Sequence, residues 1–181
     1  MVRMIKMFIG GVVAVVIGGT TFAVSQADVV NNLSTNTGMS QEQAQQYVND
    51  IPQSELASFD KIGQSFIDDG NSVFEFLPSI DCVNYVYDWE TPAMSCNDGK
   101  AQLLTVANDE IKLGKCFKAL DTNLGNAAKA KITECLSDIN TVDSDFNLPV
   151  VTTLLDSKSI TESKNTNAYK KSVLQAAIKS N

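Results

Sequence analysis

The chain of 181 residues contains no histidine. Histidine is the commonest general base and the commonest metal ligand near neutral pH, so its absence argues against most acid–base enzymes and the usual metal sites. Other catalytic motifs are missing as well, because the chain has no Walker loop, no dinucleotide fingerprint, no HExxH and no CxxC. The sequence therefore predicts a protein that is not an enzyme and that needs no cofactor.

Basic residues are scarce in the first half of the chain. From Asp28 to Asp98 there are 12 acidic residues, and Lys61 is the one basic residue. From Gly99 to Asn181 the balance is more even, with 11 basic and nine acidic residues. This acidity argues against nucleic acid or anionic lipid as a partner, because both require basic patches. The simplest interpretation of this asymmetry is two solvated surfaces of different charge, and the alternative is that the acidic half attracts the second half or a cationic partner.

Charged residues are absent from Met7 to Ala27, directly after Arg3 and Lys6. A positive start, an apolar middle and the small residues around Ser25-Gln26-Ala27 are typical of a cleaved signal peptide. The run is also close to the roughly 20 residues of a membrane-spanning helix. In that second interpretation, small residues would pack against another helix in the membrane: Gly10, Ala14 and Gly18. Both interpretations make residues 1–27 an apolar export helix and place the rest outside the cytoplasm.

Four cysteines occur, and all of them follow residue 81. In an exported chain four cysteines most simply form two disulfides. Cys82 and Cys96 enclose one loop, while Cys116 and Cys135 lie almost symmetrically about a turn between two expected helices. We therefore predict the pairs 82–96 and 116–135, although sequence alone leaves the other two connectivities open.

Helical periodicity dominates the chain after residue 39. Ser40 begins a capping box for a helix to about Asn49, and residues 52–77 carry apolar side chains at helical spacing. Residues 28–39 are polar and rich in turn formers, so we interpret them as a linker. The sequence predicts an all-α fold, a small disulfide-stapled bundle of about five or six helices in one domain, 40–181. The later helices are expected over about 100–120, 126–139, 149–155 and 168–179.

Aromatic residues are few, but three of them occur within five consecutive positions inside the loop that Cys82 and Cys96 enclose. Tyr85, Tyr87 and Trp89 alternate, so an extended backbone would place all three rings on one face. The rings could fold back over the helical core or form an exposed patch. Because Tyr and Trp are favoured at interfaces, they are our candidate residues for contact with another protein or an assembly.

Two other functions compete with protein binding. A hydrophobic small molecule could be carried between helices, in a pocket lined by Phe59, Phe66, Val73 and Phe74. Gly63 and Gly70 lie beside these residues, and we explain them more simply by close helix packing. Alternatively, an uncleaved N-terminal helix would make the chain an accessory subunit of a membrane complex. The sequence favours a secreted, periplasmic or lumenal protein with a binding or structural role.

Overall fold

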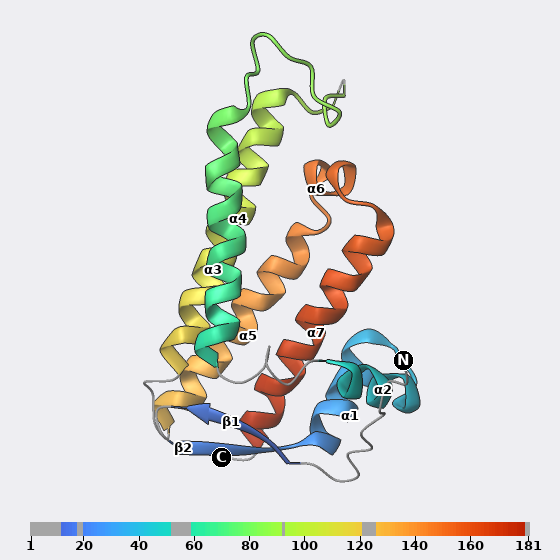
Figure 1. Ribbon diagram of the computed structural model, residues 1–181, viewed down its shortest axis with the longest axis vertical. Helices are drawn as coiled ribbons and strands as arrows, with labels where there is room; N and C mark the ends of the chain where they lie inside the picture. The colour runs from blue at the N-terminus through green and yellow to red at the C-terminus, as the bar shows by residue number, and fades with distance from the viewer. Residues whose placement is uncertain (1–11, 18–19, 52–58, 92, 121–125, 180–181) are drawn as a thin grey trace, which may run out of the picture.

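The computed structural model describes residues 12–17, 20–51, 59–91, 93–120 and 126–179. Within these residues seven α-helices form an elongated bundle with a two-stranded hairpin at one end (Figure 1). The all-α prediction is confirmed, with seven helices rather than five or six. In chain order the elements are β1 (Val12–Ile17), β2 (Thr20–Ser25), α1 (Gln26–Thr37), α2 (Gln41–Asp50), α3 (Phe59–Phe76), the 3-10 turn η2 (Leu77–Ser79), α4 (Cys96–Leu120), α5 (Asn126–Asp145), α6 (Pro149–Leu154) and α7 (Ser157–Lys179).

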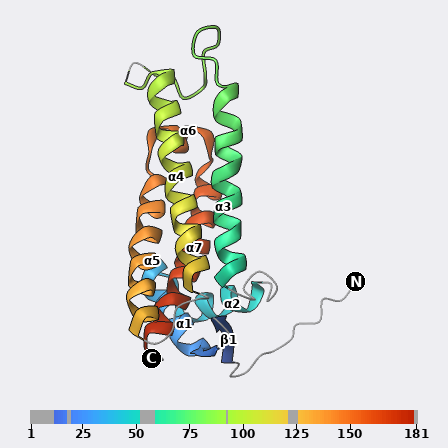
Figure 2. The same cartoon turned by 90° about the vertical axis from the view of Figure 1, so that its left-hand side faces the viewer.

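Helices α3 and α4 lie side by side as a long antiparallel hairpin (Figures 1 and 2). Glycine permits their close approach. A Cβ atom added at Gly63 would lie 2.5 Å from the carbonyl oxygen of Gly114, and one added at Gly70 would lie 2.7 Å from that of Ala107. The prediction of close packing at Gly63 and Gly70 is therefore confirmed, and α3 continues through Gly70 without a break.

Two apolar cores fill the bundle. The lower core lies at the end that holds the strands. In it the Phe117 ring stacks on Phe66, with centroids 5.8 Å apart, and lies tilted against Phe59, with centroids 5.9 Å apart. The predicted inward face of α7 contributes to this core through Tyr169, Val173, Ala176 and Ala177. The upper core lies at the other end and comprises Leu77, Ile80, Trp89, Met94, Cys96, Leu103, Val150 and Val151.

Residues 28–39 do not form the expected linker, because most of them belong to α1. The Ser25 hydroxyl caps this helix by accepting from the Asp28 N–H, and Gly38 ends it with a φ of 75°. Asn, Ser and Thr make the segment look polar. Its three apolar residues nevertheless share one face and enter the lower core: Val29, Val30 and Leu33. Helix α1 packs against α7, where the Asn36 amide donates to Ser172 and Gln175.

The prediction of an N-terminal helix is wrong for residues 12–17 and 20–25, which form strands. Strands β1 and β2 pair in antiparallel fashion, with Val12 opposite Ser25 and Ile17 opposite Thr20. Our prediction relied on apolar length, whereas the β-branched Val, Ile and Thr residues of this stretch favour strands. Ala14 lies in β1, and Gly10 and Gly18 lie outside the described residues. Among the helices that the structure describes, none is both long enough and apolar enough to span a membrane.

Several element boundaries differ from the predictions. Helix α4 begins at Cys96 rather than near residue 100, and α5 continues to Asp145 instead of ending near Ile139. Helix α7 includes residues 157–167, which looked like a polar connection. The α2 capping box at Ser40 is confirmed. Residues 52–58, expected to begin the third helix, lie outside the described part of the chain.

Both predicted disulfides are present, Cys82–Cys96 and Cys116–Cys135, each with Cα atoms 5.5 Å apart. The first ties the connection after η2 to the start of α4. The second joins α4 to α5. Two disulfides are consistent with an extracytoplasmic location, because disulfides persist in oxidising compartments.

Candidate binding surface

The connection between α3 and α4 extends beyond the other helices at one end of the bundle (Figures 1 and 2). We call residues 80–95 the tip loop. Pro78 lies in η2, which turns the chain away from α3. At the other end, the Ser95 hydroxyl accepts a hydrogen bond from the Asp98 N–H and opens α4. The Cys82–Cys96 disulfide closes the loop between these two ends.

The upper core anchors the tip loop to the bundle. Trp89 is only 2% exposed and its indole lies directly against Gly99, where a Cβ atom would collide with the ring. Met94 is also buried, and it pairs with Thr91 through two backbone hydrogen bonds. Val150 in α6 supports the same core from below. The loop is therefore held by packing as well as by its disulfide.

Tyr87 stacks on Trp89, with ring centroids 4.4 Å apart and an angle of 14° between the ring planes. The Tyr87 hydroxyl accepts a hydrogen bond of 2.8 Å from the Asp81 N–H and donates one of 3.4 Å to the Ser79 carbonyl oxygen. These two rings fold back over the core, which was one of our two interpretations. They are therefore positioned as supports of the loop rather than as its outer contact surface.

Turns at residues 82–84 and 88–89 break the extended backbone that the alternation of aromatic residues suggested. Tyr85 consequently points to solvent, with 66% of its surface exposed. Its neighbours Val83 and Val86 are 90% and 85% exposed. Sequence reasoning concentrated on the aromatic rings and missed both valines. Their exposure could have been predicted, because they are apolar residues in a stretch without the helical spacing that would bury them.

One of the exposed valines, Val83, stands on an ordered turn. The Asp81 carboxylate accepts from the backbone N–H groups of Val83 and Asn84 at 3.0 and 3.2 Å, and from the Asn84 side-chain amide at 2.7 Å. The amide hydrogen bond, with the two backbone bonds, lowers the pKa of the Asp81 carboxyl below its usual value. An ordered turn loses less conformational entropy on binding, so it favours contact with a partner.

Acidic residues lie close in sequence to the exposed apolar side chains. Asp81, Asp88 and Glu90 belong to the tip loop, and Glu75 lies near the end of α3. Lys100 lies nearby, and its ammonium group donates to the Ile80 carbonyl oxygen at 3.4 Å. The loop thus combines exposed apolar residues with acidic residues close to them in sequence, which we call the acidic rim, and this composition is complementary to an apolar surface that carries basic residues.

The four residues expected to line an apolar pocket do not share one site. Phe59 and Phe66 are buried in the lower core, Val73 packs against the upper core, and Phe74 is exposed. A cleft of about 360 Å³ does open beside α1, α5 and α7. Its lining is mainly polar, which does not suit a hydrophobic ligand: Asn36, Thr37, Asp143, Thr161, Lys164, Asn165, Ala168 and Lys171.

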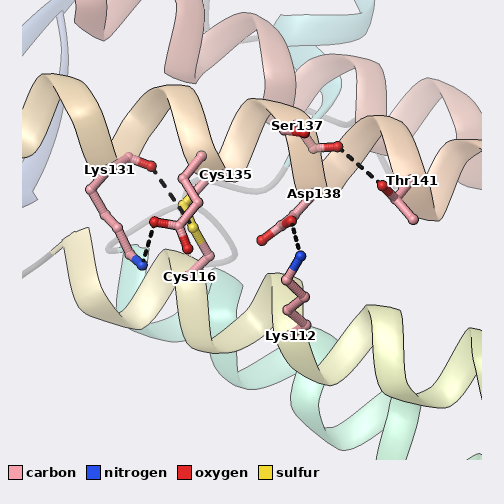
Figure 3. A network of polar contacts seen from close by, with 8 residues as sticks. Lys112, Cys116, Lys131, Cys135, Ser137, Asp138 and Thr141 are labelled. Atoms are coloured by element: carbon pink, nitrogen blue, oxygen red, sulfur yellow. Dashed lines mark hydrogen bonds and ion pairs between the residues drawn. A yellow bond between two sulfur atoms is a disulfide. The ribbon is translucent and has the colours of Figure 1, made fainter.

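One further cluster holds side chains of the kind that bind metals. In the part of the chain that the structure describes, Cys116, Glu134 and Asp138 form the one such group close enough to share an ion. The Cys116 sulfur is bonded to Cys135 in a disulfide (Figure 3). A disulfide sulfur carries no negative charge, so the oxidised cluster offers two carboxylates and no thiolate.

Comparison of the chain with protein-family models, with curated proteins and with solved structures gave no significant match in any of the three.

Proposed function

We propose that this chain is a non-enzymatic, extracytoplasmic binding protein that contacts another protein through its tip loop. The observation that carries the proposal is the exposure of three adjoining apolar residues on a cross-linked, ordered loop: Val83, Tyr85 and Val86. Apolar groups exposed together commonly mark interaction sites. The export signal predicted for residues 1–27 and the two disulfides support an oxidising compartment outside the cytoplasm.

The partner is expected to have an apolar centre and basic residues around it. Val83, Tyr85 and Val86 would fill the centre, and burial of apolar surface would supply most of the binding free energy. The acidic rim would act mainly on the rate of association, because exposed charges steer encounters and are screened by salt. Binding should therefore weaken moderately, rather than vanish, when the salt concentration is raised.

The experiment begins with a photo-crosslinking residue at Val83 in the full chain, used to capture and identify the partner in material from the natural source. Affinity is then measured with the purified partner. Replacing Val83→Ser and Val86→Ser together should weaken binding about 10- to 100-fold, the usual effect of truncating interface anchors. Circular dichroism and the unfolding temperature should remain unchanged, because both side chains lie outside the cores.

A matched control is available in Leu154 and Leu155, which are also exposed and apolar but lie at the end of α6. Replacing both with Ser should leave affinity unchanged. An equal loss of affinity in the two double variants would mean that non-specific apolar contacts, and not the tip loop, account for binding. Unchanged affinity of the Val83→Ser/Val86→Ser variant would reject the tip loop as the contact surface.

A further inference from the structure

The Cys116–Cys135 disulfide lies beside a set of charged side chains between α4 and α5 (Figure 3). Lys112 lies one turn before Cys116 on α4, and its ammonium group is 2.7 Å from the Asp138 carboxylate on α5. The Lys131 ammonium group is 2.8 Å from the Glu134 carboxylate. Potential ligand atoms of Cys116, Glu134 and Asp138 all lie within 4.8 Å of one another.

A second observation that points to a ligand concerns the carboxylate of Asp138. The residue is only 5% exposed, yet its Oδ2 atom meets no hydrogen-bond donor in the described part of the chain. Figure 3 shows one carboxylate oxygen of Asp138 held by Lys112 and the other on the side of the disulfide. A buried carboxylate oxygen that no protein donor pairs is costly, so this oxygen is available to a cationic ligand that enters the site.

We propose that the dithiol form of this chain binds one divalent metal ion of zinc-like character through Cys116, Cys135, Asp138 and Glu134. Zinc is bound by thiolate sulfur and carboxylate oxygen in tetrahedral sites. Zinc–sulfur bonds of about 2.3 Å in a tetrahedron place the two sulfurs roughly 3.7 Å apart. The two helices hold the cysteine Cα atoms 5.5 Å apart, so the Cys135 thiol stays beside the group formed by Cys116, Glu134 and Asp138 and would have to turn toward it to bind the same ion.

The chemistry balances with a dithiol reductant. The reductant gives two electrons and two protons to the two sulfurs, which become thiols, and it closes to a cyclic disulfide. The metal ion then displaces both thiol protons to solvent and is held by two thiolates and two carboxylates. Lys112 and Lys131 offset the remaining negative charge. A newly made chain carries both thiols from the start. A disulfide oxidant would later take two electrons from the two thiolates and, with two protons from solvent, become two thiols, while the Cys116–Cys135 disulfide forms and the metal ion is released.

The test compares zinc binding by the oxidised and reduced full-length chain, in competition with a chromophoric chelator. The reduced chain should bind one Zn²⁺, and the oxidised chain should bind at least 100-fold more weakly. Asp138→Asn keeps both thiols and should weaken zinc binding at least 10-fold. Asp145→Asn is the matched control, because Asp145 is also a buried α5 carboxylate with an unpartnered oxygen, and zinc binding should be unchanged.

Two thiols in an unfolded chain also bind zinc, so a separate measurement must show that the folded chain binds it. Zinc should raise the unfolding temperature of the reduced wild-type chain and of the Cys82→Ser/Cys96→Ser variant, because ligands that bind the folded state stabilise it. The rise should be absent for Cys116→Ser and smaller for Asp138→Asn. The proposal is overturned if the oxidised chain binds equally well, if Asp138→Asn binds as tightly as wild type, or if the reduced chain binds no zinc.

Discussion

At the scale of single residues, glycines set how closely α3 and α4 can lie. Gly63 and Gly114 face one another, and a Cβ atom on either would lie 2.5 Å from the carbonyl oxygen of the other. Backbone atoms cannot move aside as a flexible side chain can. The absence of a side chain at these two positions is therefore a packing requirement of the helical hairpin.

Gly63→Ala should destabilise the protein by about 1–3 kcal/mol, because overpacking forces the two backbones apart. The free energy of unfolding in denaturant measures the effect. Gly38→Ala is the contrasting variant, since a Cβ atom there meets nothing within 4 Å and only the positive φ of 75° opposes it. It should lose about 1 kcal/mol. A Gly63→Ala variant as stable as wild type would show that the helices separate freely.

Trp89 shows what the sequence predicted at this scale and what it did not. Clustering of aromatic residues correctly marked the loop as unusual, but it did not determine which rings point inward. That choice depends on Gly99, ten residues later, whose missing side chain leaves space for the indole. The turns of the loop also expose Val83 and Val86. The candidate contact residues therefore still lie in the predicted loop, but they include these valines in place of Tyr87 and Trp89.

At the scale of elements, a capping arrangement joins the tip loop to α4. The Asp98 carboxylate accepts from the Ser95 hydroxyl at 2.7 Å and from the Ser95 N–H at 3.2 Å, while the Ser95 hydroxyl accepts from the Asp98 N–H. The side-chain bond, followed by the backbone bond, lowers the pKa of the Asp98 carboxyl. This reciprocal pair begins the helix at the disulfide.

Ser95→Ala should destabilise the protein by about 1 kcal/mol, the usual effect of losing an N-terminal cap. Thermal unfolding measures the loss. Ser72→Ala serves as the control, because the Ser72 hydroxyl is exposed and bonds only to the Asp68 carbonyl oxygen of its own helix. It should be neutral or slightly stabilising. Equal effects of the two variants would argue that Ser95 is not acting as a cap.

Helices with strong local signals were predicted well, whereas elements formed by tertiary contact were not. The α2 helix has its capping box and α3 its apolar stripe, and both depend on residues close together in sequence. Helix α1 depends on burial against α7, more than 130 residues away, so its Asn and Thr residues misled the prediction. The strand pairing of residues 12–25 was missed because apolar length alone does not separate strand from helix.

At the scale of the whole molecule, a layer of carboxylates separates the two cores. Asp69 lies between lower-core and upper-core residues along α3, and Glu110 does so along α4. Asp145 ends α5, between Val142 of the lower core and Phe146, which packs against the upper core. Burial, with the charges of Asp69 and Asp145, raises the pKa of Glu110 to about 7, against the opposing effect of Lys170. Burial and Asp109 raise the pKa of Asp145 to about 6.

These shifts predict that lowering the pH from 8 to 5 stabilises the protein. Between pH 4.5 and 7 the folded chain keeps a proton on Glu110 that the unfolded chain has released, so this contribution is present at low pH and lost as pH rises through about 7. Asp145 behaves likewise up to about pH 6. Allowing for partial solvent exposure, the Glu110 contribution is of the order of 1–2 kcal/mol.

Thermal unfolding at pH 5 and pH 8 measures this contribution. Glu110→Gln should match wild type at pH 5 and exceed it at pH 8, by about 2–4 °C for each kcal/mol. Glu162→Gln, an exposed change in a surface ion pair of α7, should show the wild-type difference between the two pH values. Parallel behaviour of wild type and Glu110→Gln would remove Glu110 as the source of the pH dependence.

The placement of the tip loop gives the bundle the geometry of a spacer. Helix α4 has 25 residues, and at 1.5 Å per residue it is about 37 Å long. The strands and α1 lie at one end of that length and the tip loop at the other (Figures 1 and 2). This span is several times the roughly 8 Å over which charges act in physiological salt. The charge of a surface that contacts the strand end therefore does not act on the tip loop. Encounters between the tip loop and a partner depend instead on the length of the bundle and on the orientation of its strand end.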